Sequence, residues 1–149
     1  MLFKKHFNLI AICLAIMIIC VGLPLATGQD AAQTWLDSDS GLTWTVKDNG
    51  EDVSWSQGNN YCRTLDLDGH TDWRLPTIDE LKSIYDKNQS KRFKAKGPIE
   101  LDMATVWSSE QNKSGDVWSL NFSYGGKSLS PTGGCGSSAR TLCVRKDAE

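Results

Sequence analysis

The stretch GHTDWRLPT, at residues 69–77, constrains the fold more strongly than any other part of the sequence. Leu75 precedes Pro76 and must be extended, because the proline ring disfavours the helical conformation for the residue before it. Thr77 and Glu80 then have the spacing of a capping box, which marks the start of a helix. The sequence therefore predicts an extended segment that changes abruptly into a helix. The apolar side of this helix consists of Ile78, Leu81, Ile84 and Tyr85.

Within the extended segment, neighbouring side chains point in opposite directions. Trp73 and Leu75 share one side and are expected to enter the core. Arg74 points the other way, where a carboxylate or backbone carbonyls can accept its hydrogen bonds. We therefore interpret the motif as structural, with no catalytic role for its charged residues. Its members are Asp72, Trp73, Arg74, Leu75, Pro76, Thr77 and Glu80.

The N-terminus has the organisation of a secretory signal peptide. Lys4 and Lys5 precede an uncharged apolar run at residues 9–23, and small residues follow at 26–28. The run is shorter than the roughly 20 residues that a membrane-spanning helix needs. We therefore expect residues 1–28 to be removed during export.

Removal leaves residues 29–149, which we expect to form a single domain with its core at residues 35–146. The expected location is the periplasm, the cell surface or the medium. Two alternatives stay open: an uncleaved segment that anchors the chain in a membrane, and lipidation at Cys20. Ile19 argues against lipidation, because the residue before a lipidated cysteine should be small.

Charge and metal-ligand content exclude several functions. After residue 28 the chain has 14 basic and 18 acidic residues, a net charge of −4, which argues against a nucleic-acid partner. His70 is the one histidine of this part, and no C-x-x-C pair occurs, so a zinc site of the usual kind is not expected. The DSDSG stretch at residues 37–41 resembles a calcium loop only faintly and is interpreted as a turn. We expect no metal or cofactor.

Alternation and capping signals place the remaining elements. Ser54 and Gln57 form a second capping box, before a helix whose inward face includes Cys62. Gly125 and Gly126 indicate a tight hairpin. The sequence therefore predicts an α+β fold with two short helices and a small antiparallel, meandering sheet. Strands are expected at residues 42–46, 104–109, 116–122, 127–130 and 140–145.

Several motifs occur in the order of a bacterial domain family. They are GLTW, a helix with Tyr61-Cys62, GHTDWRLPTIDELKSI, VWSS, VWSLNFSYGG and a closing CVR. Over about residues 35–146 the chain resembles the C-terminal domain of the Legionella collagen-like protein. This family is similar in fold to C-type lectins and formylglycine-generating enzymes, so the resemblance implies a C-type-lectin-like fold in an extracellular module. Its named member is associated with adhesion and sulfated glycans, but the present chain lacks the collagen-like repeats.

The resemblance also implies how the cysteines pair. Cys62, Cys135 and Cys143 remain after export, and the odd number by itself suggests one disulfide and one free thiol. In the implied fold, the first helix and the last strand are neighbours. We therefore predict a Cys62–Cys143 disulfide, with Cys135 free or paired between molecules.

No catalytic residue is assigned. Asp and Glu are plentiful enough for a pair of carboxylates that cleaves glycosides, so this alternative stays open, but nothing in the sequence singles out two of them. The calcium-binding triplets of C-type lectins are absent. A formylglycine-generating copper enzyme needs a close cysteine pair, whereas Cys135 and Cys143 are eight residues apart. A Ser-His-Asp triad would have to use His70, and no Gly-x-Ser-x-Gly elbow exists. A copper enzyme therefore stays only as a remote alternative.

A basic segment is the best candidate for a binding site. Clustered cations bind sulfates and phosphates, and Arg92 can offer a forked pair of hydrogen bonds. Phe93 can anchor the loop or contact a sugar. We expect a binding module for a sulfated glycan or another polyanion. The alternatives are a solvated loop and, for the whole domain, a structural component that contacts another envelope or appendage protein. The candidate residues are Lys91, Arg92, Phe93, Lys94 and Lys96.

Overall fold

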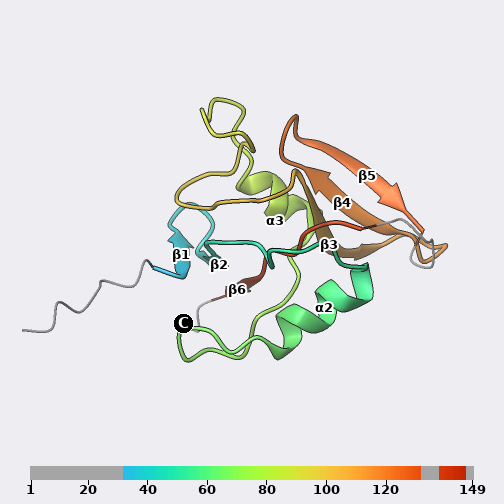
Figure 1. Cartoon of the computed structure of the whole chain (residues 1–149), viewed down its shortest axis with the longest axis horizontal. Coiled ribbons are helices and arrows are strands. Elements are labelled where there is room, and N and C mark those ends of the chain that lie inside the picture. The colour runs from blue at the N-terminus through green and yellow to red at the C-terminus, as the bar shows by residue number, and fades with distance from the viewer. Residues whose placement is uncertain (1–31, 132–137, 147–149) are drawn as a thin grey trace, which may run out of the picture. The chain divides into compact units, whose positions relative to one another are not determined.

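The computed structural model describes residues 32–131 and 138–146. These residues belong to one structural unit, and the two short helices and the short strands among them confirm the α+β class (Figure 1). The strands are β1 (Thr34–Asp37), β2 (Leu42–Thr45), β3 (Thr105–Gln111), β4 (Val117–Asn121), β5 (Gly126–Ser130) and β6 (Val144–Lys146). The helices are α2 (Trp55–Thr64) and α3 (Ile78–Ser83). The predicted signal peptide and Cys135 lie outside the described residues.

The strands form two antiparallel sheets instead of the single meander predicted from the sequence. One sheet has the order β1-β2-β6 and joins the two ends of the domain, whereas only the β3-β4-β5 sheet is a meander (Figure 1). Every residue of β2 is buried, so both faces of this strand are covered. The last strand, β6, pairs with one edge of β2, and β1, which the sequence analysis missed, pairs with the other edge.

Both predicted capping boxes are present. The Ser54 hydroxyl accepts the Gln57 backbone N–H, and the Gln57 side chain accepts the Ser54 N–H. Thr77 and Glu80 exchange the same two bonds at the start of α3. Each exchange satisfies N–H groups that a helix leaves without intrahelical partners. Short helices such as these depend on packing as well as on their caps.

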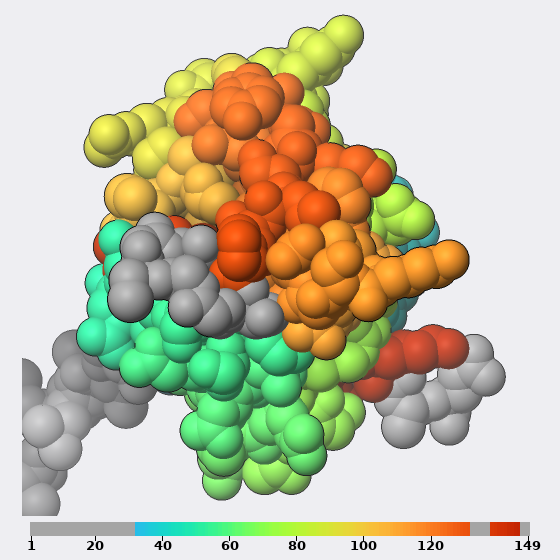
Figure 2. Space-filling view, turned by 90° about the vertical axis from the view of Figure 1, so that its right-hand side faces the viewer, coloured from blue at the N-terminus to red at the C-terminus, as the bar shows by residue number. Residues whose placement is uncertain are grey.

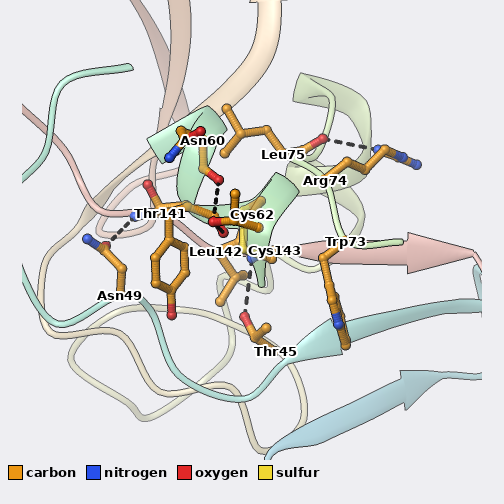
Figure 3. Close-up of a disulfide and its surroundings, with 12 residues drawn as sticks. Thr45, Asn49, Asn60, Cys62, Trp73, Arg74, Leu75, Thr141, Leu142 and Cys143 are labelled. Carbon is orange, nitrogen blue, oxygen red and sulfur yellow. Dashed lines mark hydrogen bonds between the residues drawn. A yellow bond between two sulfur atoms is a disulfide. The ribbon is translucent and has the colours of Figure 1, made fainter. Parts of the chain in front are cut away.

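A disulfide joins the end of α2 to the chain just before β6. Cys62 and Cys143 are bonded at 2.06 Å, which confirms the predicted pairing (Figure 3). Both residues are fully buried, and the Cys143 backbone N–H donates to the Thr45 hydroxyl at 3.2 Å. The disulfide therefore ties α2 to the β1-β2-β6 sheet and is compatible with an exported protein.

The core consists of two clusters. One lies under α3 and contains Trp44, Leu81 and Phe122, all fully buried. The other surrounds the disulfide and contains Trp73 and Trp107. The similarity to C-type lectins stays a prediction. No helix of the described residues is long and apolar enough to cross a membrane.

Candidate binding surface

The extended part of the DWRLPT motif is fixed from both sides. Trp73 and Leu75 are 2% and 1% exposed, as their alternation predicted. The indole Nε1 of Trp73 also donates to the His70 carbonyl at 3.0 Å. The Arg74 backbone exchanges two hydrogen bonds with Val144 at 3.0 and 2.9 Å. The motif therefore connects the start of β6 to the second core cluster.

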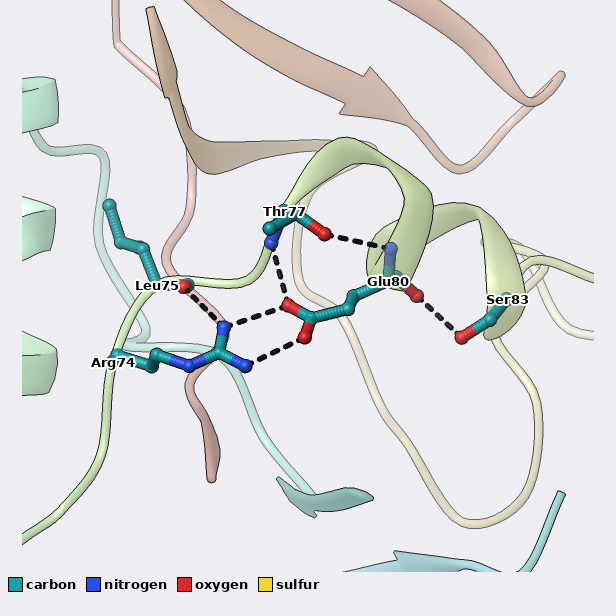
Figure 4. Close-up of polar contacts among 5 residues, drawn as sticks. All are labelled: Arg74, Leu75, Thr77, Glu80 and Ser83. Carbon is teal, nitrogen blue, oxygen red and sulfur yellow. Dashed lines mark hydrogen bonds and ion pairs between the residues drawn. The ribbon is translucent and has the colours of Figure 1, made fainter. Parts of the chain in front are cut away.

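Arg74 and Glu80 form a forked ion pair that also supports the cap of α3 (Figure 4). Arg74 Nη2 and Nη1 donate to Glu80 Oε1 and Oε2 at 2.6 and 2.8 Å, and Nη1 reaches the Leu75 carbonyl at 3.1 Å. Glu80 Oε2 also accepts the Thr77 backbone N–H at 2.8 Å. The hydrogen bonds from Arg74 hold the pKa of Glu80 below its ordinary value, and the same contact raises the pKa of Arg74. One arginine thus finds both partners proposed for it, a carboxylate and a carbonyl.

Asp72 is also paired within the fold. Its carboxylate accepts Arg145 Nε at 2.9 Å, and this hydrogen bond lowers the pKa of Asp72. The Arg145 side chain is only 8% exposed, and its guanidinium lies 6.0 Å from the centre of the Trp73 ring. The charged residues of the motif are therefore occupied by contacts that hold β6 and α3 together.

The basic segment follows α3 and forms a loop held by its own lysines. Lys91 Nζ donates to the carbonyls of Gly97 and Ile99 at 2.5 and 3.0 Å. Lys94 Nζ donates to the Gln89 carbonyl at 3.1 Å. Carbonyl contacts fix the ammonium groups in place but leave their positive charge without a counter-ion.

The other members of the segment differ in exposure. Arg92 is exposed, and its guanidinium lies 5.0 Å from the centre of the Phe93 ring. Phe93 is half-buried against the first core cluster, so it anchors the loop and supports the arginine. Lys96 forms an ion pair with Asp39 at 3.6 Å. Among the described residues, no ion pair neutralises Lys91, Arg92 or Lys94.

Two tyrosines lie beside this loop: Tyr85, which the sequence analysis placed on the apolar side of the helix, and Tyr124, which it did not consider as a candidate. The Lys94 backbone N–H donates to the Phe122 carbonyl at 2.8 Å, so the loop runs along the end of β4. A Cβ at Gly125 would lie 2.6 Å from the Tyr85 ring, and one at Gly126 would lie 2.2 Å from the Tyr124 ring. Tyr124 is 66% exposed.

The space-filling view shows how these segments meet. The loop after α3, in yellow-green to yellow, borders the orange β4–β5 strands at the top of the visible face (Figure 2). The two consecutive glycines were assigned to a hairpin alone. The absence of their side chains also makes room for aromatic rings, and Tyr124, directly before the two glycines, was the signal in the sequence.

A few other residues were considered for metal binding or catalysis, and the structure shows where they lie. No group of three His, Cys, Asp or Glu residues in the described part of the chain is placed to hold a metal ion. In the DSDSG turn, Asp37 accepts the Ser40 hydroxyl at 2.6 Å and the Gly41 N–H at its carbonyl. His70 is exposed in a turn. Cys143, which the copper hypothesis requires as a thiol, is bonded to Cys62.

A comparison with protein families assigns the whole folded region. The family model of the Lcl C-terminal domain matches residues 33–145, which is more than half of the chain. No curated protein matches the chain. The match begins just before β1 and ends within β6, so it covers both sheets, both helices and the disulfide. The chain therefore belongs to the Lcl C-terminal domain family.

Proposed function

We propose that this domain is an exported, non-catalytic binding module for sulfated glycans or other polyanions. The observation that supports it is the set of uncompensated cations on the loop after α3. Lys91 and Lys94 are held by backbone carbonyls, and Arg92 is exposed above the Phe93 ring. Cations already fixed in place lose little conformational freedom when they bind an anion.

The chemistry of the loop suits sulfate groups on a polymer. Arg92 can donate two parallel hydrogen bonds to a sulfate, and the lysines act as nearby point charges. Because the rest of the mature chain is acidic, the loop is the place to which an approaching polyanion is steered. Exposed charges are screened within about 8–10 Å at physiological salt, so binding of this kind weakens as salt rises.

The contacts of the lysines decide which variants are informative. Alanine at Lys91 or Lys94 removes a cation and also releases the carbonyls that hold the loop. Arg92→Ala removes an exposed cation that contacts the Phe93 ring, so the fold should tolerate it. Lys113→Ala is the matched control, because it removes one positive charge from an exposed turn between β3 and β4.

The test is retention of the mature, oxidised protein on an immobilised heparin-like polymer over a salt gradient. The wild type and Lys113→Ala should elute at similar salt, whereas Arg92→Ala and Arg92→Lys should elute earlier, with the alanine variant first. Equal elution of Arg92→Ala and Lys113→Ala would show that net charge, and not this loop, governs retention. Absence of retention even at low salt would contradict the proposed function.

A further inference from the structure

The sequence contains three Asn-x-Ser tripeptides, at residues 88–90, 112–114 and 121–123. Asn-x-Ser is the acceptor signal for N-linked glycosylation in exported proteins. The first two tripeptides share a further feature, an acidic residue two positions before the asparagine: Asp86 and Glu110. The third has Ser119 at that position. The structure separates these three candidates by what surrounds each asparagine.

Asn121 is part of β4 and is paired across the hairpin. Its backbone is in register with Gly126, and its side-chain Oδ1 accepts the Ser123 N–H at 2.8 Å. The middle residue of the tripeptide, Phe122, is fully buried in the core. A transferase could not bind this tripeptide without unfolding the β4–β5 hairpin.

Asn112 is also occupied, although it lies in a turn. Its Oδ1 accepts the backbone N–H groups of Ser114 and Asp116, both at 2.9 Å. Its Nδ2, the atom that would carry a sugar, donates to the Asp116 carboxylate at 2.9 Å. The Asn112 side-chain amide thus holds its loop together through these hydrogen bonds, and glycosylation would break the bond from Nδ2.

Asn88 is placed differently. It lies in the turn after α3, and both Asn88 and Ser90 are exposed. The Asp86 carboxylate accepts the backbone N–H of Asn88 at 2.9 Å and Gln89 Nε2 at 3.0 Å. These hydrogen bonds lower the pKa of Asp86, the backbone N–H of Asn88 being the first cause, so the acidic residue is ionised at neutral pH. The hydrogen bond from Asn88 uses its backbone N–H, so the side-chain amide that would carry the sugar takes no part in this contact.

We propose that Asn88 accepts an N-linked oligosaccharide when the protein is exported, whereas folded Asn112 and Asn121 do not. The donor is an oligosaccharide linked to a polyprenyl pyrophosphate. A bond forms between Asn88 Nδ2 and the anomeric carbon of the first sugar. The bond from that carbon to the pyrophosphate oxygen breaks, its electron pair stays on the pyrophosphate, and the amide proton is released to it or to water. The inference rests on the export that forms part of the proposed function.

Mass spectrometry of the full chain, made in its own cells and recovered from the exported fraction, tests the proposal. The wild type should exceed the polypeptide mass by a set of sugar residues, located on the peptide that contains Asn88. Asn88→Gln and Ser90→Ala should return to the polypeptide mass, and Asn112→Gln, the matched control, should stay modified. An exported wild type at the bare polypeptide mass would overturn the proposal. If the chain is instead found inside the cell with its N-terminal segment still attached, the proposed export is wrong.

A second arm tests site selection independently of export. Purified, unmodified protein is incubated with a lipid-linked oligosaccharide and an oligosaccharyltransferase. The chosen enzyme accepts Asn-x-Ser tripeptides that have an acidic residue two positions before the asparagine. The folded, oxidised protein should be modified at Asn88 alone, and the reduced, unfolded protein at both Asn88 and Asn112. Modification of Asn112 in the folded protein, or none at Asn88, would overturn the proposal.

Discussion

Two charged segments flank α3, and they use their charges in opposite ways. Before the helix, Arg74 and Asp72 each have an ionic partner of opposite sign, in Glu80 and Arg145. After the helix, Lys91 and the other cations of the loop are held by carbonyls or left exposed (residues 91–94). In the first segment the charges form ion pairs that stabilise the fold. In the second segment these cations have no ionic partner among the described residues, as the proposed binding of a polyanion requires.

This difference explains why the conspicuous motif is not the best candidate site. An arginine that already forms a forked pair with a carboxylate has few N–H groups left for a ligand. A lysine on a carbonyl keeps its full charge. The comparison therefore predicts that substitutions before α3 act on stability, and that substitution of Arg92 acts on binding.

The largest effect is expected at Trp73. Trp73→Ala should lower the free energy of unfolding by about 3–5 kcal/mol, because it leaves a large cavity beside the disulfide. Trp73→Phe should cost less, since it keeps a buried ring and loses the bond to the His70 carbonyl. Urea unfolding followed by circular dichroism measures both. Unchanged stability in Trp73→Ala, together with lost polymer retention, would place Trp73 in a binding site.

The disulfide should have the next largest effect. Replacing both Cys62 and Cys143 with Ala should cost about 2–4 kcal/mol, because the bridge spans a sequence separation of 81 residues. Peptide mapping of the unreduced protein provides the direct control for the pairing. A Cys135–Cys143 peptide would contradict the connection between α2 and the chain before β6.

A smaller, pH-dependent effect is expected at Glu80. Glu80→Gln should cost about 1 kcal/mol near neutral pH, since solvent screens a pair whose side chains are 43% and 20% exposed. The folded-state pKa of Glu80 is lowered, so its contribution is present above the unfolded value of about 4.3 and is lost as pH falls through the folded value. The stability difference between wild type and variant should therefore shrink below about pH 4. A difference that stays constant with pH would show that the ion pair contributes nothing.

The features that stabilise the fold around α3 could be predicted from the spacing of nearby residues in the sequence. The caps at Ser54 and Thr77 and the burial of Trp73 follow from residues close in sequence. The pairing of β6 with β2 was not predictable in this way, because it joins segments about a hundred residues apart.

Contacts that depend on the path of the folded chain also escaped prediction at the candidate binding surface. The sequence shows that the basic residues cluster, but the carbonyls that Lys91 and Lys94 contact depend on the path of the loop. Tyr124 lies beside Gly126 because of the hairpin geometry, which two glycines permit but do not specify.

The most direct test compares Arg74→Ala with Arg92→Ala in two measurements on the same preparations. Free energy of unfolding is measured in urea, and retention on the heparin-like polymer is measured where both variants are folded. Arg74→Ala should lose about 1–2 kcal/mol, because Glu80 is left without its partner, and should keep near wild-type retention. Arg92→Ala should change stability by less than about 0.5 kcal/mol and should elute at lower salt than the wild type. Loss of retention in folded Arg74→Ala, with Arg92→Ala unaffected, would contradict the division of roles between the two segments.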